Sequence, residues 1–262
     1  MKNTLYIKDL KKFFNNKRIL ITGNTGFKGI WLSVILKNFG AKIYGFSLKE
    51  PSRIKNLKLF NLDKEVDTCY GNITNKDLFY KYSKKVNPHI IFHLAAQPLV
   101  KESYTNPYDT FKTNVMGMLN VLEYAKLAKS LKSVVLITSD KCYKNKELSS
   151  GYNENSELGG DDPYSASKAC SELITNAYIK CFNNDIGIAT ARAGNVIGGG
   201  DWAKDRIIPD FIKAVMNNKP IKIRNPNSRR PWQHVLEPLS GYLMLAKNMH
   251  QESKKLSYET AY

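Results

Sequence analysis

The segment Arg18-Ile-Leu-Ile-Thr-Gly-Asn-Thr-Gly-Phe-Lys-Gly29 decides the fold of this chain. It opens with a short apolar, β-branched run that stops at glycine, which is typical of a buried strand. Residues 27–39 then carry apolar side chains at helical spacing, and Gly40 is suited to end a helix because it tolerates left-handed torsions. The segment therefore predicts a strand, a tight turn and a helix.

Three glycines, Gly23, Gly26 and Gly29, recur in this turn. The first permits the tight turn, the second lets the backbone approach a pyrophosphate, and the third lets the helix pack closely on the strand. The free amides at the start of the helix also attract negative charge. We therefore favour a dinucleotide site over a merely structural turn. Its predicted residues are Gly23, Thr25, Gly26, Phe27, Lys28 and Gly29.

Alternating strands and helices continue along the chain. Further strands are expected at 41–47, 65–70, 89–94, 133–138 and 186–191, and helices at 75–86, 107–129 and 163–183. Continuous apolar strands between helices indicate a parallel sheet that helices cover on both faces. We expect an α/β fold in which residues 1–192 form a doubly wound parallel Rossmann sheet.

The pattern changes after Arg192. A run of three glycines at 198–200 interrupts it, a helix is expected at 208–217, and a proline- and arginine-rich segment at 224–231 precedes a last helix. Ligands of open α/β sheets bind at the carboxyl edge of the strands. We therefore expect residues 193–262 to form a smaller substrate-binding lobe that covers this edge.

The type of dinucleotide depends on the end of the second strand. An acid about 20 residues beyond the glycines holds the ribose of NAD, but Ser47 takes this place here. Because Lys49 and Arg53 lie nearby and suit a 2′-phosphate, NADP stays open beside NAD. The other expected cofactor contacts are Asn72, Ile73, Leu94, Ala95 and Ala96. For the two alanines, ordinary packing is an equally good interpretation.

Tyr164 and Lys168 are four residues apart and share one face of a helix that begins near Pro163. A phenol titrates near about pH 10, and a neighbouring ammonium favours the phenolate, which makes Tyr164 a candidate base. A lone pair at this spacing is more often a surface feature. Its place after the fifth strand of a dinucleotide fold favours catalysis.

The fifth strand ends in Thr138-Ser-Asp-Lys141, which brings a hydroxyl, a carboxylate and an amine to the carboxyl edge. Elsewhere such a tetrapeptide is a helix cap or a solvated turn. Here Ser139 is suited to hydrogen-bond a reacting hydroxyl, Asp140 is a candidate acid and Lys141 a candidate base.

Together these motifs resemble the extended short-chain dehydrogenases/reductases of the NAD-dependent epimerase/dehydratase family, and within them the CDP-glucose 4,6-dehydratases. In that family, dTDP-glucose dehydratases carry Asp-Glu where this chain has Asp140-Lys141, and 4-epimerases lack the pair. The resemblance spans nearly the whole chain: TGNTGFKG (22–29), HLAAQ (93–97), TNVMG (113–117), TSDKCY (138–143), DPYSASKA (162–169), ARAGNVIGGGDW (191–202) and RRPWQHVLEP (229–238).

The resemblance implies an NAD-dependent hydro-lyase that converts CDP-glucose into CDP-4-keto-6-deoxyglucose. Tyr164 would be the base at the C4 hydroxyl, Lys141 would take the C5 proton, and Asp140 would protonate the leaving C6 hydroxyl. The catalytic residues it implies are Ser139, Asp140, Lys141, Tyr164 and Lys168, of which Tyr164 and Lys168 also contact the cofactor. The substrate-binding residues it implies are Gln97, Asn195, Arg206 and Arg230.

Several alternatives stay open within this resemblance. Arg206 and Arg230 suit a diphosphate but are equally candidates for surface ion pairs. Trp202, Trp232 and His234 either line the sugar or base pocket or pack in the core. The rival functions are a nucleotide-sugar 4-epimerase, a dTDP- or GDP-sugar dehydratase, and a non-catalytic dinucleotide sensor.

Two features depart from the family pattern. Asn72 stands where an acid is usual near the adenine, and the chain stops at Tyr262, short of the usual length. We therefore expect the C-terminal lobe to be truncated. The resemblance also implies a homodimer through two long helices.

The composition and charge of the chain limit the classes of partner that we expect. The net charge of +17 comes from 40 Lys and Arg against 23 Asp and Glu, but these residues are spread along the chain without a nucleic-acid motif, so no nucleic-acid partner is expected. No apolar run approaches the ~18 residues of a membrane span. The scattered Cys69, Cys142, Cys170 and Cys181 suggest neither a metal site nor disulfides, and a reducing cytoplasm fits them best.

Overall fold

The computed structural model describes residues 2–49, 57–182, 185–221, 223 and 226–251. Its centre is a six-stranded sheet in the order β3-β2-β1-β4-β5-β6, in which every neighbouring pair is parallel. The strands are β1 (Arg18–Thr22), β2 (Lys42–Ser47), β3 (Asp67–Tyr70), β4 (Ile90–His93), β5 (Ser133–Ile137) and β6 (Gly187–Ala191). This order confirms the predicted doubly wound parallel sheet.

Helices cover both faces of the sheet because the strands are apolar on both sides. Ile19 and Ile21 of β1 face one cluster, which α1 (Lys2–Phe14), α2 (Phe27–Asn38) and α11 (Leu236–Gln251) complete. Leu20, between them, faces the other cluster, which α5 (Lys76–Val86), α8 (Gly117–Leu127) and α9 (Pro163–Cys181) complete. The alternation follows from the two-residue period of a strand.

The helix expected at 107–129 has a more complex form. It comprises α7 (Pro107–Phe111), a π-helical turn (Lys112–Met116) and α8, and α6 (Val100–Thr105) precedes it. A π-helical turn inserts one residue into the helix and often marks a functional site. Here it turns Asn114 inward, where the side chain donates to Ser167 of α9 at 2.8 Å.

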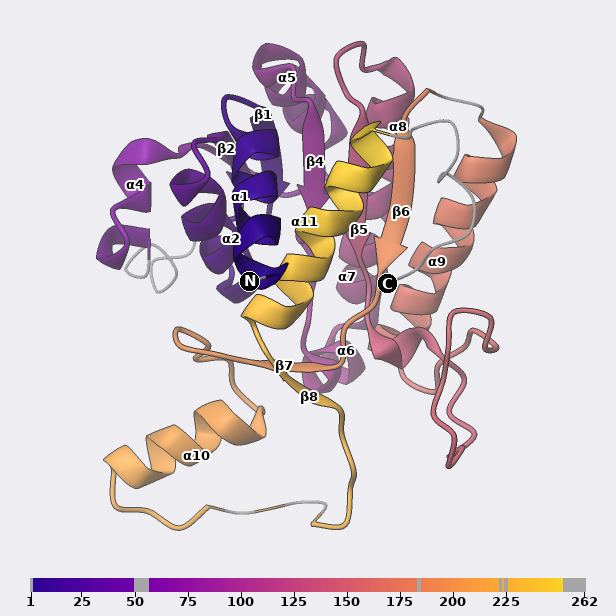
Figure 1. Ribbon diagram of the computed structural model, residues 1–262. Helices are drawn as coiled ribbons and strands as arrows, with labels where there is room; N and C mark the ends of the chain where they lie inside the picture. Colours follow the sequence, from indigo (N-terminus) through magenta and orange to yellow (C-terminus); the bar gives the residue numbers. More distant parts are fainter. Residues whose placement is uncertain (1, 50–56, 183–184, 222, 224–225, 252–262) are drawn as a thin grey trace.

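The C-terminal part has two components. α11 lies in the expected lobe by sequence, yet it packs on the sheet: a Cβ on Gly187 of β6 would lie 2.5 Å from Cβ of Met249. The residues before it form a two-stranded parallel sheet of β7 (Asn195–Ile197) and β8 (Trp232–His234), with α10 (Ile207–Met216) between the strands. Figure 1 shows β7, β8 and α10 beyond the carboxyl edge of the main sheet.

The remaining short elements are α4 (Leu62–Glu65) and the 3-10 turn η2 (Asp140–Cys142). Within the described part of the chain, no helix is both long and apolar enough to cross a membrane. Arg53, considered above for cofactor choice, lies outside the described residues.

Candidate active site

The turn after β1 is shaped by its glycines. Gly23 has a φ of +73°, and a Cβ there would lie 2.8 Å from the amide nitrogen of Ala95. A Cβ on Gly29 would lie 2.2 Å from the carbonyl oxygen of Gly23, so only glycine lets α2 start this close to the strand. Of the described residues, a Cβ on Gly26 would meet only that same oxygen, at 3.2 Å, which leaves its other side open.

This open side fits a pyrophosphate. Gly26 is the N-cap of α2, and no side chain of the described residues caps the first amides of this helix. Such amides bind anions well because they carry the positive end of the helix dipole. The turn therefore has the backbone and the space that a dinucleotide requires.

The residues around the turn fix its shape. Ser47, at the end of β2, lies 2.7 Å from Thr25 between their hydroxyl oxygens, and Asn24 donates to the hydroxyl of Thr68 at 2.9 Å. The Oδ1 atom of Asn24 is buried and has no hydrogen-bond partner among the residues that the structure describes. Asn24 was not among the predicted residues. The sequence signal for it was Gly45 in the second strand, because a Cβ on Gly45 would lie 2.3 Å from the side-chain amide nitrogen of Asn24.

The other predicted cofactor residues lie at the ends of β3 and β4. Asn72 is exposed and accepts a hydrogen bond from the Thr74 amide at 3.0 Å, while Ile73 is buried against Gly117. The amide of Ala95 donates to the Thr22 hydroxyl at 3.2 Å, next to Gly23. Leu94, Ala95 and Ala96 are partly buried and follow β4 directly.

The two predicted catalytic segments converge. α9 starts at Pro163 because Asp162 caps it, accepting from the Ser165 amide at 2.9 Å, which places Tyr164 in the first turn. The Tyr164 hydroxyl lies near Ser139, beyond the end of β5, close enough for the Ser139 hydroxyl to lower the pKa of the phenol. The Ser139 hydroxyl also donates to Asp140 at 2.9 Å. The phenol, the hydroxyl and the carboxylate thus form one cluster.

Burial dominates the protonation of Tyr164. It raises the pKa of this phenol to about 12, although the hydrogen bond to Ser139 and the charge of Arg206 lower it. From the sequence we expected a neighbouring ammonium to favour the phenolate. In the protein alone the desolvation of the phenolate outweighs these groups.

Two buried lysines, Lys28 and Lys168, have lowered pKa values in this part of the molecule. The pKa of Lys168 is lowered to about 8, chiefly by burial and also by the charge of Lys28. Burial also lowers the pKa of Lys28 to about 8, with Arg206 acting in the same direction and Asp140 against it. The charges of Lys28, Lys168, Arg206 and Asp140 therefore act on one another near Tyr164.

The predicted substrate residues are placed differently from one another. Arg206 is an ion-pair partner of Asp201 at 2.9 Å, and the charge of Arg206 still reaches Tyr164. Arg230 is exposed, two residues before β8, whose first residue pairs with Asn195 of β7. Gln97 is bonded within its surroundings, because its amide donates to Thr110 at 2.8 Å and to the Leu99 carbonyl.

Three further predicted residues can also be placed. Lys141 is half-buried, and its amide donates to the Ser139 hydroxyl at 3.3 Å. Trp202 and Trp232 are 50% and 47% exposed, so neither packs in the core. Among the described residues, no three His, Cys, Asp or Glu side chains gather as a metal site would need.

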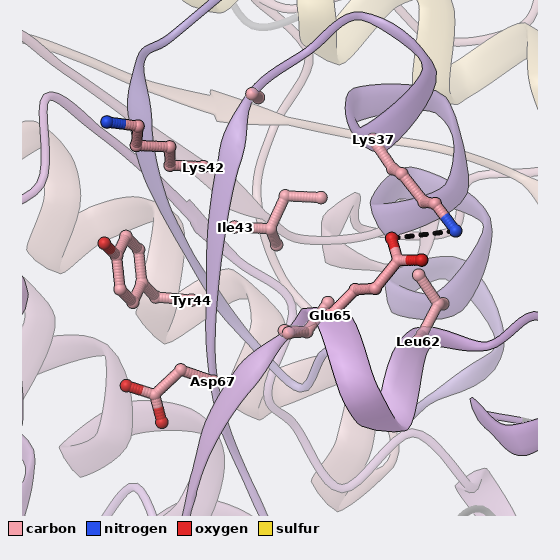
Figure 2. Close-up of a pocket in the computed structure, with 9 residues that line it drawn as sticks. Lys37, Lys42, Ile43, Tyr44, Leu62, Glu65 and Asp67 are labelled. Carbon is pink, nitrogen blue, oxygen red and sulfur yellow. Dashed lines mark ion pairs between the residues drawn. The ribbon is translucent and has the colours of Figure 1, made fainter.

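A pocket of about 380 Å³ lies away from the Tyr164 cluster. Figure 2 shows it between α2, β2 and α4, with Lys37 and Glu65 forming an ion pair of 2.8 Å. Lys42 and Asp67, the first residues of β2 and β3, line it. It therefore opens at the amino ends of the strands, opposite the end that carries Tyr164.

Comparisons with known proteins agree with this geometry. The profile described as "NAD dependent epimerase/dehydratase family" matches residues 19–259. CDP-glucose 4,6-dehydratase from Salmonella typhimurium is 47% identical over 254 residues, which are 94% of this chain and 71% of that protein. dTDP-D-glucose 4,6-dehydratase from Dictyostelium discoideum is 32% identical over 216 residues, 78% of this chain and 49% of that protein.

Solved structures show the same fold. An epimerase from Methanothermobacter thermautotrophicus superposes with a TM-score of 0.81 at 26% identity, covering 92% of this chain and 71% of that one. A dTDP-glucose 4,6-dehydratase from Streptomyces venezuelae, solved with NAD bound, gives 0.77 at 24% identity, covering 88% and 72%.

Proposed function

The chain belongs to the NAD-dependent epimerase/dehydratase family, and from this membership we propose that it is a hydro-lyase that converts CDP-glucose into CDP-4-keto-6-deoxyglucose and water. The observation that carries the proposal is the cluster of Tyr164, Ser139 and Asp140 beside the glycine turn. The 47% identity to a CDP-glucose 4,6-dehydratase supports the choice of sugar nucleotide.

The glycine turn and the start of α2 would hold NAD. Gly26 offers the open side for the pyrophosphate, and the uncapped amides of α2 supply donors. Ser47, hydrogen-bonded to Thr25, stands at the ribose position and carries no positive charge that would demand a 2′-phosphate. Bound NAD would supply the acceptor, and later the donor, of one hydride.

Tyr164 and Ser139 would act first. Both side chains are buried, so the reacting hydroxyl of the sugar would be held away from bulk water. The positive charge of bound NAD would favour the phenolate of Tyr164, which would then take the proton of the C4 hydroxyl while Ser139 hydrogen-bonds the same oxygen. Lys168 follows Tyr164 by one helical turn, and in the protein alone its ammonium donates to the Ile137 carbonyl at 3.1 Å.

Lys141 and Asp140 would act second. Once C4 is a ketone, the C5 proton is acidic, and Lys141 takes it while Asp140 gives a proton to the departing C6 hydroxyl. Lys141 then returns a proton to C5. The proton that Tyr164 gains from C4 balances the one that Asp140 gives to water, so the cycle consumes no acid or base.

The adjacent Asp140 and Lys141 favour a dehydratase over a 4-epimerase, because an epimerase needs no acid and base to expel a hydroxyl. The direct test is incubation of the protein and NAD with CDP-, dTDP-, GDP- and UDP-glucose in turn. We expect the 4-keto-6-deoxy sugar to form fastest from CDP-glucose. Formation of the 4-epimer would contradict this assignment, and so would turnover of one of the other three sugar nucleotides without turnover of CDP-glucose. Binding without turnover would favour the non-catalytic sensor.

We also propose that two copies pair through α8 and α9. Leu127 at the end of α8 and Leu173 of α9 are 61% and 56% exposed, and Met116 precedes α8 with 50% exposure. Large apolar side chains of this kind favour association. Leu173→Glu should convert a dimer into a monomer in sedimentation analysis.

The free thiols of the described cysteines suit the cytoplasm, where we place the protein.

A further inference from the structure

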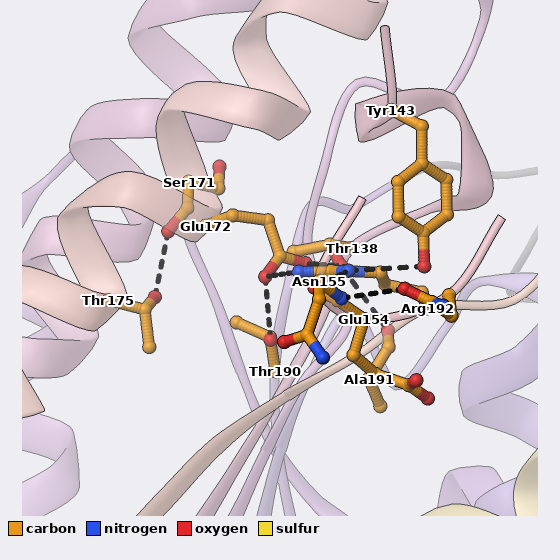
Figure 3. A network of polar contacts seen from close by, with 11 residues as sticks. Thr138, Tyr143, Glu154, Asn155, Ser171, Glu172, Thr175, Thr190, Ala191 and Arg192 are labelled. Carbon is orange, nitrogen blue, oxygen red and sulfur yellow. Dashed lines mark hydrogen bonds and ion pairs between the residues drawn. The ribbon is translucent and has the colours of Figure 1, made fainter. Parts of the chain in front are cut away.

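A buried polar network lies behind the segment 138–143, which carries Asp140 and Lys141. Figure 3 shows it: Glu172 extends from α9 toward Arg192, which follows β6, and Thr138 and Tyr143 approach the same pair. The Glu172 and Arg192 side chains are 4% and 10% exposed. None of these four residues is assigned a role in the reaction proposed above.

Glu172 is fully engaged by its neighbours. Its carboxylate accepts from Nε and Nη2 of Arg192 at 3.0 and 2.9 Å, which is a forked contact. Thr190 of β6 donates to it at 2.7 Å, and the Thr138 hydroxyl donates to it as well. A carboxylate has about four acceptor positions, so these contacts satisfy the buried charge.

The pair holds both ends of the catalytic segment. Glu172 binds Thr138 at its start, and Arg192 binds Tyr143 at its end, where Nη1 donates to the phenol at 3.1 Å and the guanidinium lies 4.9 Å from the ring centre. Tyr143 also stacks on Tyr152 at 5.2 Å. The segment is therefore clamped at two points by one ion pair.

The same pair joins this segment to the helix of the other catalytic residues. Glu172 is one helical turn after Lys168 and two turns after Tyr164, all on α9. Any tilt of α9 against β5 and β6 would move Tyr164 away from Ser139. The ion pair therefore connects the helix that carries Tyr164 to the segment that carries Asp140 and Lys141.

We propose that the buried Glu172–Arg192 pair is a positioning device that fixes the 138–143 segment, and with it Asp140 and Lys141, against α9. The assignment of a catalytic role to that segment rests on the proposed function. The pair itself does not touch the reacting atoms. Buried ion pairs add little net stability compared with apolar packing, so a role in geometry explains better why two charges are buried here.

The amides of the segment report its order directly. Those of Thr138, Asp140, Cys142 and Tyr143 donate to backbone carbonyls, and that of Lys141 donates to Ser139, so all five should exchange slowly with solvent deuterium. In Arg192→Lys the charge remains, but the fork and the contact with Tyr143 are lost. We expect these amides to exchange about tenfold faster, while those of β1 stay unchanged.

Two matched controls separate the clamp from general packing. Glu123→Gln removes another carboxylate that is bound to α9, through Tyr178 at 2.7 Å, but it lies away from the segment. Thr138→Val and Thr190→Val each delete one hydroxyl donor to Glu172, and only the first is at the end of the segment. Faster exchange of the segment is expected in Thr138→Val and not in Glu123→Gln or Thr190→Val.

Kinetics add the second readout. A misplaced acid and base should lower kcat in Arg192→Lys by about 10²-fold and leave KM for CDP-glucose within about twofold, because binding groups are untouched. The proposal would be overturned if the amides of residues 138–143 exchanged at the same rate in Arg192→Lys and in the wild type. It would also be overturned if amide exchange became faster by the same factor throughout the protein, because the pair would then only stabilise the fold. If the wild type turned over no sugar nucleotide, the proposed function would fail, but the exchange data would still decide whether the pair holds the segment.

Discussion

The Lys168 ammonium donates a hydrogen bond to the backbone carbonyl of Ile137, the last residue of β5, with 3.1 Å between the two atoms. This bond ties α9 to the strand that leads into Ser139, Asp140 and Lys141. Lys168 is 5% exposed, so its charge is held in a poorly solvated place. A lysine in that position has consequences both for stability and for chemistry.

Stability should depend on pH through Lys168. Its pKa is lowered to about 8 in the folded protein from an ordinary 10.5, chiefly by burial. Between these values the unfolded chain binds the proton and the folded one does not, so raising the pH favours folding. The contribution grows by about 1.4 kcal/mol per pH unit. Urea unfolding from pH 8 to 10 should show a rise that is smaller by this amount in Lys168→Met than in the wild type, because Lys28, whose pKa is also lowered to about 8, contributes to both proteins; parallel pH curves would refute the buried charge of Lys168.

Tyr164→Phe tests the proposed base. The change removes one oxygen from a buried side chain and leaves the ring packing, so the fold should persist. Loss of proton transfer should lower turnover of CDP-glucose by about 10² to 10⁴-fold. A coupled assay for the 4-keto product measures this. Turnover near that of the wild type would remove Tyr164 from the mechanism.

Lys141→Ala separates the two halves of the reaction. If Lys141 takes the C5 proton, deuterium from heavy water should no longer enter C5, while oxidation at C4 continues. Mass spectrometry of the recovered sugar nucleotide follows both. Lys144→Ala is the control, since Lys144 is an exposed partner of Glu157, 2.9 Å away. Loss of both steps in Lys141→Ala would show a structural role instead.

Gly26→Ala and Gly29→Ala should fail in different ways. At Gly29 a Cβ would lie 2.2 Å from a backbone oxygen, so we expect a loss of about 1–3 kcal/mol in urea unfolding. At Gly26 the added methyl meets only one atom at 3.2 Å and otherwise enters the open side, so NAD affinity should fall with little change in stability. Isothermal titration with NAD checks the second point. Equal affinity of Gly26→Ala and wild type would place the pyrophosphate elsewhere.

The sheet could be predicted because its signals are local. Each expected strand is present to within two residues at either end, since short apolar runs bounded by glycine or polar residues mark buried strands. The N-terminal helix α1 was not predicted. Its lysines obscure the apolar residues Leu10 and Phe14, which are buried only because α11 and the sheet meet them.

The division at residue 192 shows a similar limit. The sequence indicated a helix near the end of the chain, but not that α11 packs against β5 and β6. β7 and β8 were missed because each has only three residues, and they pair across a long separation in sequence. Contacts of that kind leave little trace in local periodicity.

Within the site, motif residues were easier to predict than their supports. Tyr164 and Ser139 belong to motifs with a chemical meaning, and the structure brings them together. Glu172 and Arg192 have no such pattern, because a buried ion pair is defined by two segments that meet only in the fold. Gln97 stays a predicted substrate residue, and its hydrogen bonds to Thr110 and Leu99 are contacts that no spacing in the sequence reveals.

Transfer of a label within the sugar tests the central claim most directly. CDP-glucose carrying deuterium at C4 would be incubated with the protein and NAD in ordinary water, and the product examined by NMR. If one pocket removes hydrogen from C4 and water from C5 and C6, the deuterium must appear at C6 of the same molecule. A product without deuterium at C6, or one that keeps the label at C4, would contradict the account.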